Sequence, residues 1–367
     1  MKPINLKTTL LLTLFVTVAT SCQPKNEFVL EGFLNGMPEK TEVYLINDDN
    51  GLVEDSLKVE NGEFKFKGRV PYPKTYTLEF VSGSVQQSYE LWVENTRINL
   101  EGEWDNLEQM MVSGSSQQDL KRLEDETIAF FNPEMARLQK ENKQDSIPQL
   151  LDRLTEVITE FAVKRSNTYY GVSRLYALRE RMDRERLSQT VKKIDPEILE
   201  SDYGKSLLMH LKHPELKEGD TYVDFSVPSI KGSELSISQY LNENKPVLLI
   251  LGGLGCMGNN GRELLKSFHQ NYGDKVGILA FVFARNKSEM EGDIKCSKGV
   301  NNCSFLDIDV PLISDLKGDH SPIKIRYGVQ TTPTVYVIDP QGKIRLKRMG
   351  YNPAVNDLVI TILNDGK

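Results

Sequence analysis

The sequence contains few of the residues that build disulfide frameworks or metal centres. It has 4 cysteines and 4 histidines in 367 residues. So few cysteines cannot hold a chain of this length together as a disulfide framework. A zinc site requires about four ligands, and the one closely spaced pair, Cys296 and Cys303, has no histidine or further cysteine nearby. We therefore expect neither a metal nor a cofactor, and each cysteine needs its own explanation.

Basic residues are also not in excess. The chain has 45 Lys and Arg against 52 Asp and Glu, a formal net charge of -7, with both signs spread along it. This distribution excludes the clustered basic surface of a nucleic-acid-binding protein. Hydrophobic residues make up 39% and charged residues 26%, which is typical of globular protein. The length predicts two or three domains.

Residues 1–22 have the pattern of a secretory signal peptide. Lys2 and Lys7 precede a short apolar run, and small residues lead up to Cys22. The run is too short for a membrane-spanning helix. The ending Ala19-Thr20-Ser21-Cys22 resembles a bacterial lipobox, although Ala19 stands where leucine is commonest. We expect Cys22 to carry a lipid anchor. The alternative is plain secretion with an incidental cysteine.

Residues 27–112 predict a small antiparallel β-domain. Six short, mostly alternating segments are separated by turn residues, and Asn61-Gly62 is a strong hairpin signal. The expected strands are residues 28–33, 43–46, 64–67, 76–80, 89–93 and 97–100. Asp48-Asp49-Asn50 lacks the ligand spacing of a calcium loop and is interpreted as a solvated turn.

Residues 115–212 predict helices. Apolar residues between Ile147 and Phe161 recur at steps of three and four, and Pro133, Pro148 and Pro196 stand near expected helix starts or breaks. A partner-binding bundle is one interpretation. We favour a spacer that packs between two domains, because apolar stripes at helical spacing are usually core.

Residues 219–367 alternate strand-like runs with helical patterns, which indicates an α/β domain. Buried-strand runs occur at 246–251, 276–283 and 334–338. Helices are expected from Arg262 to Tyr272 and from about Ala354 to Leu363, and Asp339-Pro340-Gln341-Gly342 predicts a turn into a last edge strand.

The order of these elements resembles the thioredoxin fold. More narrowly, it resembles the envelope thiol–disulfide oxidoreductases and the redoxin or alkyl-hydroperoxide-reductase-like group. The resemblance rests on several short segments in the same order and spacing over about 145 residues. These are Asp224-Phe225-Ser226-Val227-Pro228, Lys245-Pro246-Val247-Leu248-Leu249, Tyr327-Gly328-Val329, Thr332-Pro333-Thr334 and Asp339-Pro340-Gln341-Gly342. The whole layout also resembles a family of lipoproteins from Bacteroides-like bacteria. It implies a cis peptide bond between Thr332 and Pro333 and a substrate groove there.

The expected active site departs from the family's Trp-Cys-x-x-Cys pattern. Cys256 fills the nucleophile position, but Asn259 stands where the second cysteine belongs and Gly255 replaces the tryptophan. Ile250 takes the strand position where thioredoxin has an acidic residue. A cysteine at a helix N-terminus favours the thiolate, which attacks disulfides. Because Asn259 cannot resolve the mixed disulfide, ordinary dithiol turnover is not expected.

Cys296 and Cys303 offer two further interpretations. Loops that follow parallel strands gather at one edge of a sheet, so either cysteine could approach Cys256 and replace the missing thiol. We favour a local Cys296–Cys303 disulfide, since the intervening residues include Gly299 and Asn301 and the compartment is oxidising. A true peroxidase is disfavoured, because Gly253 occupies the place where peroxiredoxins usually carry threonine.

The sequence therefore predicts a thiol–disulfide oxidoreductase-like lipoprotein of the bacterial cell envelope, mainly periplasmic, with Cys256 as a single nucleophile. Asn259, Thr332 and Pro333 would line its substrate groove. Its expected partners are protein thiols and disulfides, and the membrane through the lipid anchor. The alternative is a non-catalytic binding module that keeps the groove for protein partners. The reactivity of Cys256 distinguishes the two hypotheses.

Overall fold

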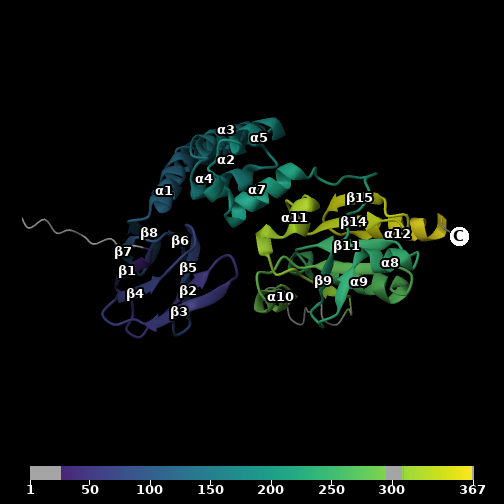
Figure 1. Ribbon diagram of the computed structural model, residues 1–367, viewed down its shortest axis with the longest axis horizontal. Helices are drawn as coiled ribbons and strands as arrows, with labels where there is room; N and C mark the ends of the chain where they lie inside the picture. Colours follow the sequence, from purple (N-terminus) through teal and green to yellow (C-terminus); the bar gives the residue numbers. More distant parts are fainter. Residues whose placement is uncertain (1–25, 295–307, 309, 366–367) are drawn as a thin grey trace, which may run out of the picture.

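The computed structural model describes residues 26–294, 308 and 310–365, without the side chains of Cys256 and of residues 292–294. Within them the chain forms a β-sandwich, a helical unit and an α/β unit, one after another (Figure 1). The sandwich consists of β1 (Phe28–Asn35), β2 (Glu42–Asn47), β3 (Leu52–Lys58), β4 (Glu63–Gly68), β5 (Lys74–Ser82), β6 (Val85–Val93), β7 (Arg97–Glu103) and β8 (Asn106–Ser113).

The sandwich packs two four-stranded sheets face to face around one apolar core. Their strand orders are β4-β1-β7-β8 and β3-β2-β5-β6. Across the core, Phe64 of one sheet meets Phe80 of the other edge to face, with ring centroids 5.6 Å apart. The predicted antiparallel β-domain is confirmed, with the exception that β1 and β7 pair in parallel.

Two strands and one hairpin differ from the sequence prediction. The pattern does not predict β3 or β8, and the side chains of β3 are nearly all exposed, so that strand carries no alternation to detect. Asn61 and Gly62 do adopt left-handed φ angles of 55° and 74°. The strands that they join belong to different sheets, however, so the turn carries the chain from one sheet to the other.

In the helical unit, three helices begin where the prolines of the sequence predict a helix start. Pro133, Pro148 and Pro196 each lie in the first turn of a helix, where a missing N–H leaves no intrahelical bond unmade. The unit consists of α1 (Ser116–Ala129), α2 (Asn132–Lys140), η1 (Gln144–Ser146), α3 (Ile147–Lys164), α4 (Tyr169–Leu178), α5 (Arg184–Val191), α6 (Pro196–Leu199) and α7 (Asp202–Lys212).

The α/β unit has the thioredoxin-like fold that the sequence resemblance implies. Its first part consists of β9 (Ser226–Pro228), β10 (Glu234–Ser236), α8 (Ile237–Asn242), β11 (Val247–Leu251), η2 (Gly255–Met257), α9 (Gly258–Tyr272), β12 (Gly277–Phe281) and α10 (Lys287–Ile294). Its second part consists of β13 (Leu312–Ile313), η4 (Gly318–His320), α11 (Pro322–Arg326), β14 (Thr334–Ile338), β15 (Ile344–Met349) and α12 (Pro353–Asp365).

The central sheet of this unit explains why its strands read as continuous apolar runs. The strand order is β13-β12-β11-β14-β15, with β11 and β12 parallel and connected by α9, and with β14 and β15 antiparallel to their neighbours. Leu248 and Ile250 face a core shared with α9 and α12, whereas Leu249 faces a second core shared with α8 and α11. Both faces are covered, so all five residues of β11 are buried.

The three units contact one another pairwise. The sandwich meets the helical unit where Trp92 donates its backbone N–H to Gln118 over 2.9 Å. The helical unit meets the α/β unit where the Tyr176 hydroxyl donates to the Asp319 carbonyl over 2.6 Å. The sandwich meets the α/β unit where Arg285 donates to the Asp48 carbonyl over 2.7 Å. The contacts therefore form a closed cycle around the middle of the molecule (Figure 1).

Candidate functional site

The backbone that leads to Cys256 passes unusually close to another segment. After β11 the Gly252 N–H donates to the Phe281 carbonyl over 2.7 Å, and Gly252 and Gly253 then adopt φ angles of 69° and 66°. A Cβ atom on Gly253 would lie 2.7 Å from the Pro333 nitrogen and 2.8 Å from the Thr332 carbonyl carbon. Only glycine permits both this conformation and this approach.

The segment on the other side is the predicted loop of Thr332 and Pro333. The peptide bond between them is cis, as the sequence resemblance implies. Two hydrogen bonds fix the loop in front of β14: the Thr334 hydroxyl donates to the Thr331 carbonyl over 2.6 Å, and the Gly350 N–H donates to the Pro333 carbonyl over 2.8 Å. The structure thus brings together two segments that lie about 80 residues apart in the sequence.

The backbone of Cys256 lies in η2, the short turn between β11 and α9. The Met257 N–H donates to the Leu254 carbonyl over 3.1 Å, and Leu254 itself is fully buried. No side chain caps the start of α9 within the described part of the chain. The first N–H groups of this helix therefore follow Cys256 directly, and their partial positive charge favours an anion at that place.

The structure places the other predicted departures from the family pattern in two different environments. Asn259 is exposed in the first turn of α9. Ile250 is fully buried in the core that β11 shares with α9 and α12. A carboxylate in place of Ile250 would need a partner in that apolar core, whereas a thiol in place of Asn259 would need none.

Three predicted site residues lie outside the described residues: Cys22, Cys296 and Cys303. Among the residues that are described, no helix is long and apolar enough to cross a membrane, and no cluster of three metal-ligating side chains occurs. His320 lies 3.0 Å from the Ser206 hydroxyl through Nδ1 and packs on Tyr203, and burial lowers its pKa. It therefore acts as a structural residue between units.

The turn Asp48-Asp49-Asn50 is not the solvated turn that the sequence suggests. It docks on the segment that follows β12, where Asn286 donates to the Asn50 carbonyl over 2.9 Å. Arg285 is held in place by Glu289, which accepts from its Nε over 2.9 Å. Local sequence cannot reveal such a contact, since its partners are more than 200 residues apart.

Two cavities lie between the three units, and sequence reasoning missed both. The larger, of about 650 Å³, is lined by β5 and β6, by α1, α4 and α7, and by the loop Val329–Thr331 in front of the cis-proline. The smaller, of about 370 Å³, shares Thr75, Glu90, Tyr203 and Asp319 with it. It reaches Phe283, whose ring lies where a Cβ atom on Gly252 would meet it at 2.9 Å. The cavities therefore adjoin the same segments as the Cys256 turn.

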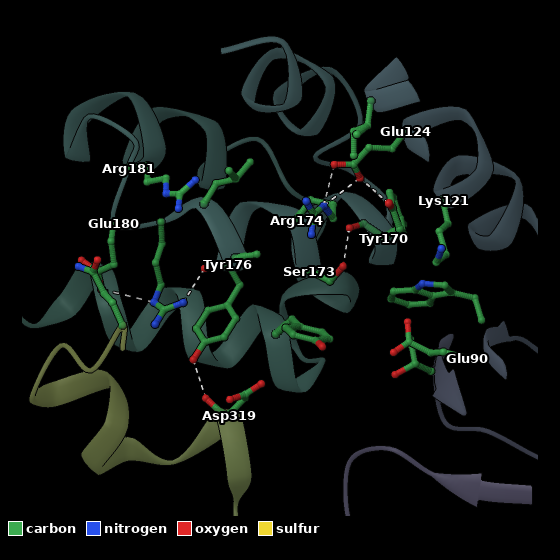
Figure 2. A pocket seen from close by; sticks show the side chains of 18 of the residues that line it. Glu90, Lys121, Glu124, Tyr170, Ser173, Arg174, Tyr176, Glu180, Arg181 and Asp319 are labelled. Carbon is green, nitrogen blue, oxygen red and sulfur yellow. Dashed lines mark hydrogen bonds and ion pairs between the residues drawn. The ribbon is translucent and has the colours of Figure 1, made fainter. Parts of the chain in front are cut away.

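Charged side chains line the larger cavity in pairs (Figure 2). Arg174 binds Glu124 over 2.9 Å, Lys121 binds Asp125 over 2.8 Å, and Lys324 forms an ion pair with Asp319. Among the described side chains, Glu90 is the exception on the acidic side and Arg181 on the basic side. Glu90 points into the cavity, and its exposed carboxyl group forms no ion pair or hydrogen bond with the described side chains.

Comparisons with known proteins find matches to separate parts of the chain. The family described as "Domain of unknown function (DUF4369)" matches residues 28–120. The thioredoxin-like protein YneN of Bacillus subtilis is 24% identical over 135 residues, which are 36% of this chain and 72% of that protein.

Solved structures with a similar fold include two from Bacteroides species. The thioredoxin domain of a thiol-disulfide oxidoreductase from Bacteroides vulgatus is 17% identical, with a TM-score of 0.33, and the match covers 41% of this chain and 100% of that chain. A thiol-disulfide oxidoreductase from Bacteroides fragilis is 19% identical, with a TM-score of 0.31, and the match covers 39% of this chain and 99% of that one. The thioredoxin-like fold itself is carried by the strand order and connections described above.

The close approach at Gly253 predicts a large difference between two glycine substitutions. Gly232→Ala, at φ 88° with open space around it, should lower the free energy of unfolding by about 1–2 kcal/mol, the usual cost of a left-handed alanine. Gly253→Ala should lower it by roughly 1–3 kcal/mol more, because its methyl group meets the backbone of the cis-proline loop. Urea unfolding measures both. Equal losses would contradict the close approach.

Proposed function

We propose that this protein is a thiol–disulfide oxidoreductase-like lipoprotein of the cell envelope in which Cys256 acts as a single nucleophile. The packing of Gly252 and Gly253 against Thr332 and Pro333 is the observation that supports it most. It sets the turn that contains Cys256 at the start of α9, beside a fixed cis-proline loop. A thiolate at that place gains from the helix dipole and from the uncapped N–H groups of α9.

The chemistry that follows is one half of a dithiol exchange. The Cys256 thiolate attacks one sulfur of a partner disulfide, a new S–S bond forms to that sulfur, and the old S–S bond breaks. The other sulfur of the partner leaves as a thiolate and takes up a proton from water. Asn259 has no thiol, so the mixed disulfide persists until an outside thiol attacks it.

We propose that Cys296 and Cys303 form a local disulfide and leave Cys256 without an internal resolving thiol. The alternative is that one of them resolves the mixed disulfide from a neighbouring loop. Thiol–disulfide chemistry is favoured over peroxidase chemistry by Gly253, since a threonine side chain there would collide with the backbone of Thr332 and Pro333.

A non-catalytic binding module is the second candidate. It is supported by the apolar Ile250 and the exposed Asn259 at positions where the family carries reactive groups. It is also supported by the cavities between the units, which offer a binding surface that needs no redox chemistry. In that case the cis-proline loop would hold a protein partner and Cys256 would be inert.

The reactivity of Cys256 tests the choice between the two candidates. In a variant with Cys22, Cys296 and Cys303 replaced by serine, iodoacetamide should modify the folded protein about threefold faster or more at neutral pH than the same chain unfolded in urea, because the thiolate fraction is higher. Mass spectrometry follows the modification. A folded rate at or below the unfolded rate would contradict the nucleophile and favour the binding module.

Restoring the second cysteine tests the role of position 259. In a Cys296→Ser, Cys303→Ser background, Asn259→Cys should raise the rate of insulin disulfide reduction by dithiothreitol about tenfold. The reason is that the new thiol can attack the mixed disulfide from within the same chain and release the product. Asn260→Cys is the matched control, also exposed but turned about 100° around α9. A parent as fast as Asn259→Cys, or an equal gain from Asn260→Cys, would show that position 259 is not the missing resolving site.

We propose further that the mature protein begins at a lipidated Cys22. In a bacterial host that processes lipoproteins, the protein should then sediment with membranes, and Cys22→Ala should either release it or block removal of residues 1–21. Cell fractionation and N-terminal mass determination measure this. Cys303→Ala, as control, should leave the distribution unchanged. A Cys22→Ala protein that still fractionates like the parent would rule out the lipid anchor.

A further inference from the structure

The cavities between the three units have features of a binding site in their own right. Their volumes, about 650 and 370 Å³, fall in the range of ligand sites in proteins, and shared lining residues join them. All three units contribute walls, and the closed cycle of contacts through Trp92, Tyr176 and Arg285 holds these walls in place. No single unit could form this site.

The wall formed by the α/β unit is suited to a polypeptide. Gln330, Thr331 and Thr332 are exposed, and their backbone N–H groups donate no hydrogen bond within the described residues. Gln330 and Thr331 line the larger cavity. A short stretch of unpaired backbone at a cavity wall fits the backbone of an extended peptide better than it fits a small ion or metabolite.

The wall formed by the sandwich contributes more carboxylates than cations to the smaller cavity. Among the described side chains, the exposed Glu90 of β6 has no ion pair or hydrogen bond. Asp48, directly after β2, accepts from the Thr77 hydroxyl over 2.8 Å through Oδ1, but its buried Oδ2 accepts no hydrogen bond. Arg285 stands 3.8 Å from Asp48 but is already bound to Glu289. Both carboxyl groups line the smaller cavity, and Glu90 lines the larger one too.

Nearby charges do not remove this imbalance. Around Glu90 stand Lys121, which is bound to Asp125, and Asp48. Around Asp48 stand Asp49, which is bound to Lys74, and Arg285. Desolvation and the neighbouring carboxylates raise the pKa of Glu90, and desolvation raises that of Asp48. An added cation at this wall would therefore stabilise both carboxylates.

We propose that the cavities bind an extended polypeptide segment of a protein partner, and that Glu90 and Asp48 of the β-sandwich select a lysine or arginine side chain in it. The segment lies with its backbone along Gln330–Thr332 and its cationic side chain toward β6. This proposal rests on the proposed function in one respect: the bound segment belongs to the protein whose disulfide Cys256 attacks. It gives the N-terminal sandwich a role in selecting partners.

The test uses the full-length protein with Cys256→Ser, so that thiol chemistry cannot contribute to binding. Two fluorescein-labelled peptides of alternating glycine and serine are compared, one with lysines at interior positions and one with glutamines at the same positions. Fluorescence anisotropy gives their dissociation constants. The lysine peptide should bind more tightly, and Glu90→Gln should weaken it about threefold or more without changing the glutamine peptide.

Glu108→Gln is the matched control, since it removes the same charge from an exposed place on β8, away from the cavities. It should leave both dissociation constants unchanged. Asp48→Asn, which keeps an oxygen for Thr77, is the second variant and should weaken the lysine peptide alone. Equal binding of the two peptides, or equal losses from Glu90→Gln and Glu108→Gln, would overturn the proposal.

The two proposals can fail separately. Peptide binding is measured in a protein that lacks the Cys256 thiol, whereas the alkylation rate of Cys256 is measured without any peptide. A reactive Cys256 with no lysine preference would leave the proposed thiol chemistry standing and overturn the selecting role of Glu90 and Asp48. An inert Cys256 with a clear lysine preference would do the reverse.

Discussion

The close contact between the backbone of Gly252–Gly253 and that of Thr332–Pro333 is the constraint on which the site depends. A side chain at Gly253 would force the two loops apart, because its first carbon would lie 2.7 Å from the Pro333 nitrogen. The same contact fixes where η2 and α9 begin, and hence where the backbone of Cys256 lies. Two successive glycines with left-handed φ angles thus set the geometry of the turn.

The fold of the α/β unit is predictable because its signals are local. Strands β11 and β14 are buried throughout, since both faces of their sheet are covered, and α9 between them turns one apolar face to the core. The sandwich is harder to predict. Strand β3 exposes almost every side chain, and the turn at Asn61-Gly62 has hairpin residues yet joins strands of different sheets. Turn chemistry specifies local conformation, not the strand's pairing partner.

The candidate site is predictable only in part, for the same reason. Cys256, Asn259 and the cis-proline loop are visible in short motifs. The role of Asp48-Asp49-Asn50 is not, because these residues have the composition of a solvated turn and acquire their partners, Arg285 and Asn286, only when distant units pack together. Glu90 gives no signal either, since an exposed glutamate in an amphipathic strand is the ordinary case and only the packing of distant units places it at a cavity.

Asp48 at the cavity wall carries a cost that the fold alone does not explain. Among the described residues its buried Oδ2 accepts no hydrogen bond, and desolvation raises the pKa of its carboxyl group above the usual range. A carboxyl whose pKa is higher in the folded than in the unfolded chain makes the free energy of unfolding fall as the pH rises from the unfolded to the folded pKa. At neutral pH the half-buried Asp48 carboxylate therefore destabilises the protein, and an asparagine at this position would avoid the cost. A cation bound beside Asp48 would lower its pKa, so that relief of this cost would add to the affinity for the cation.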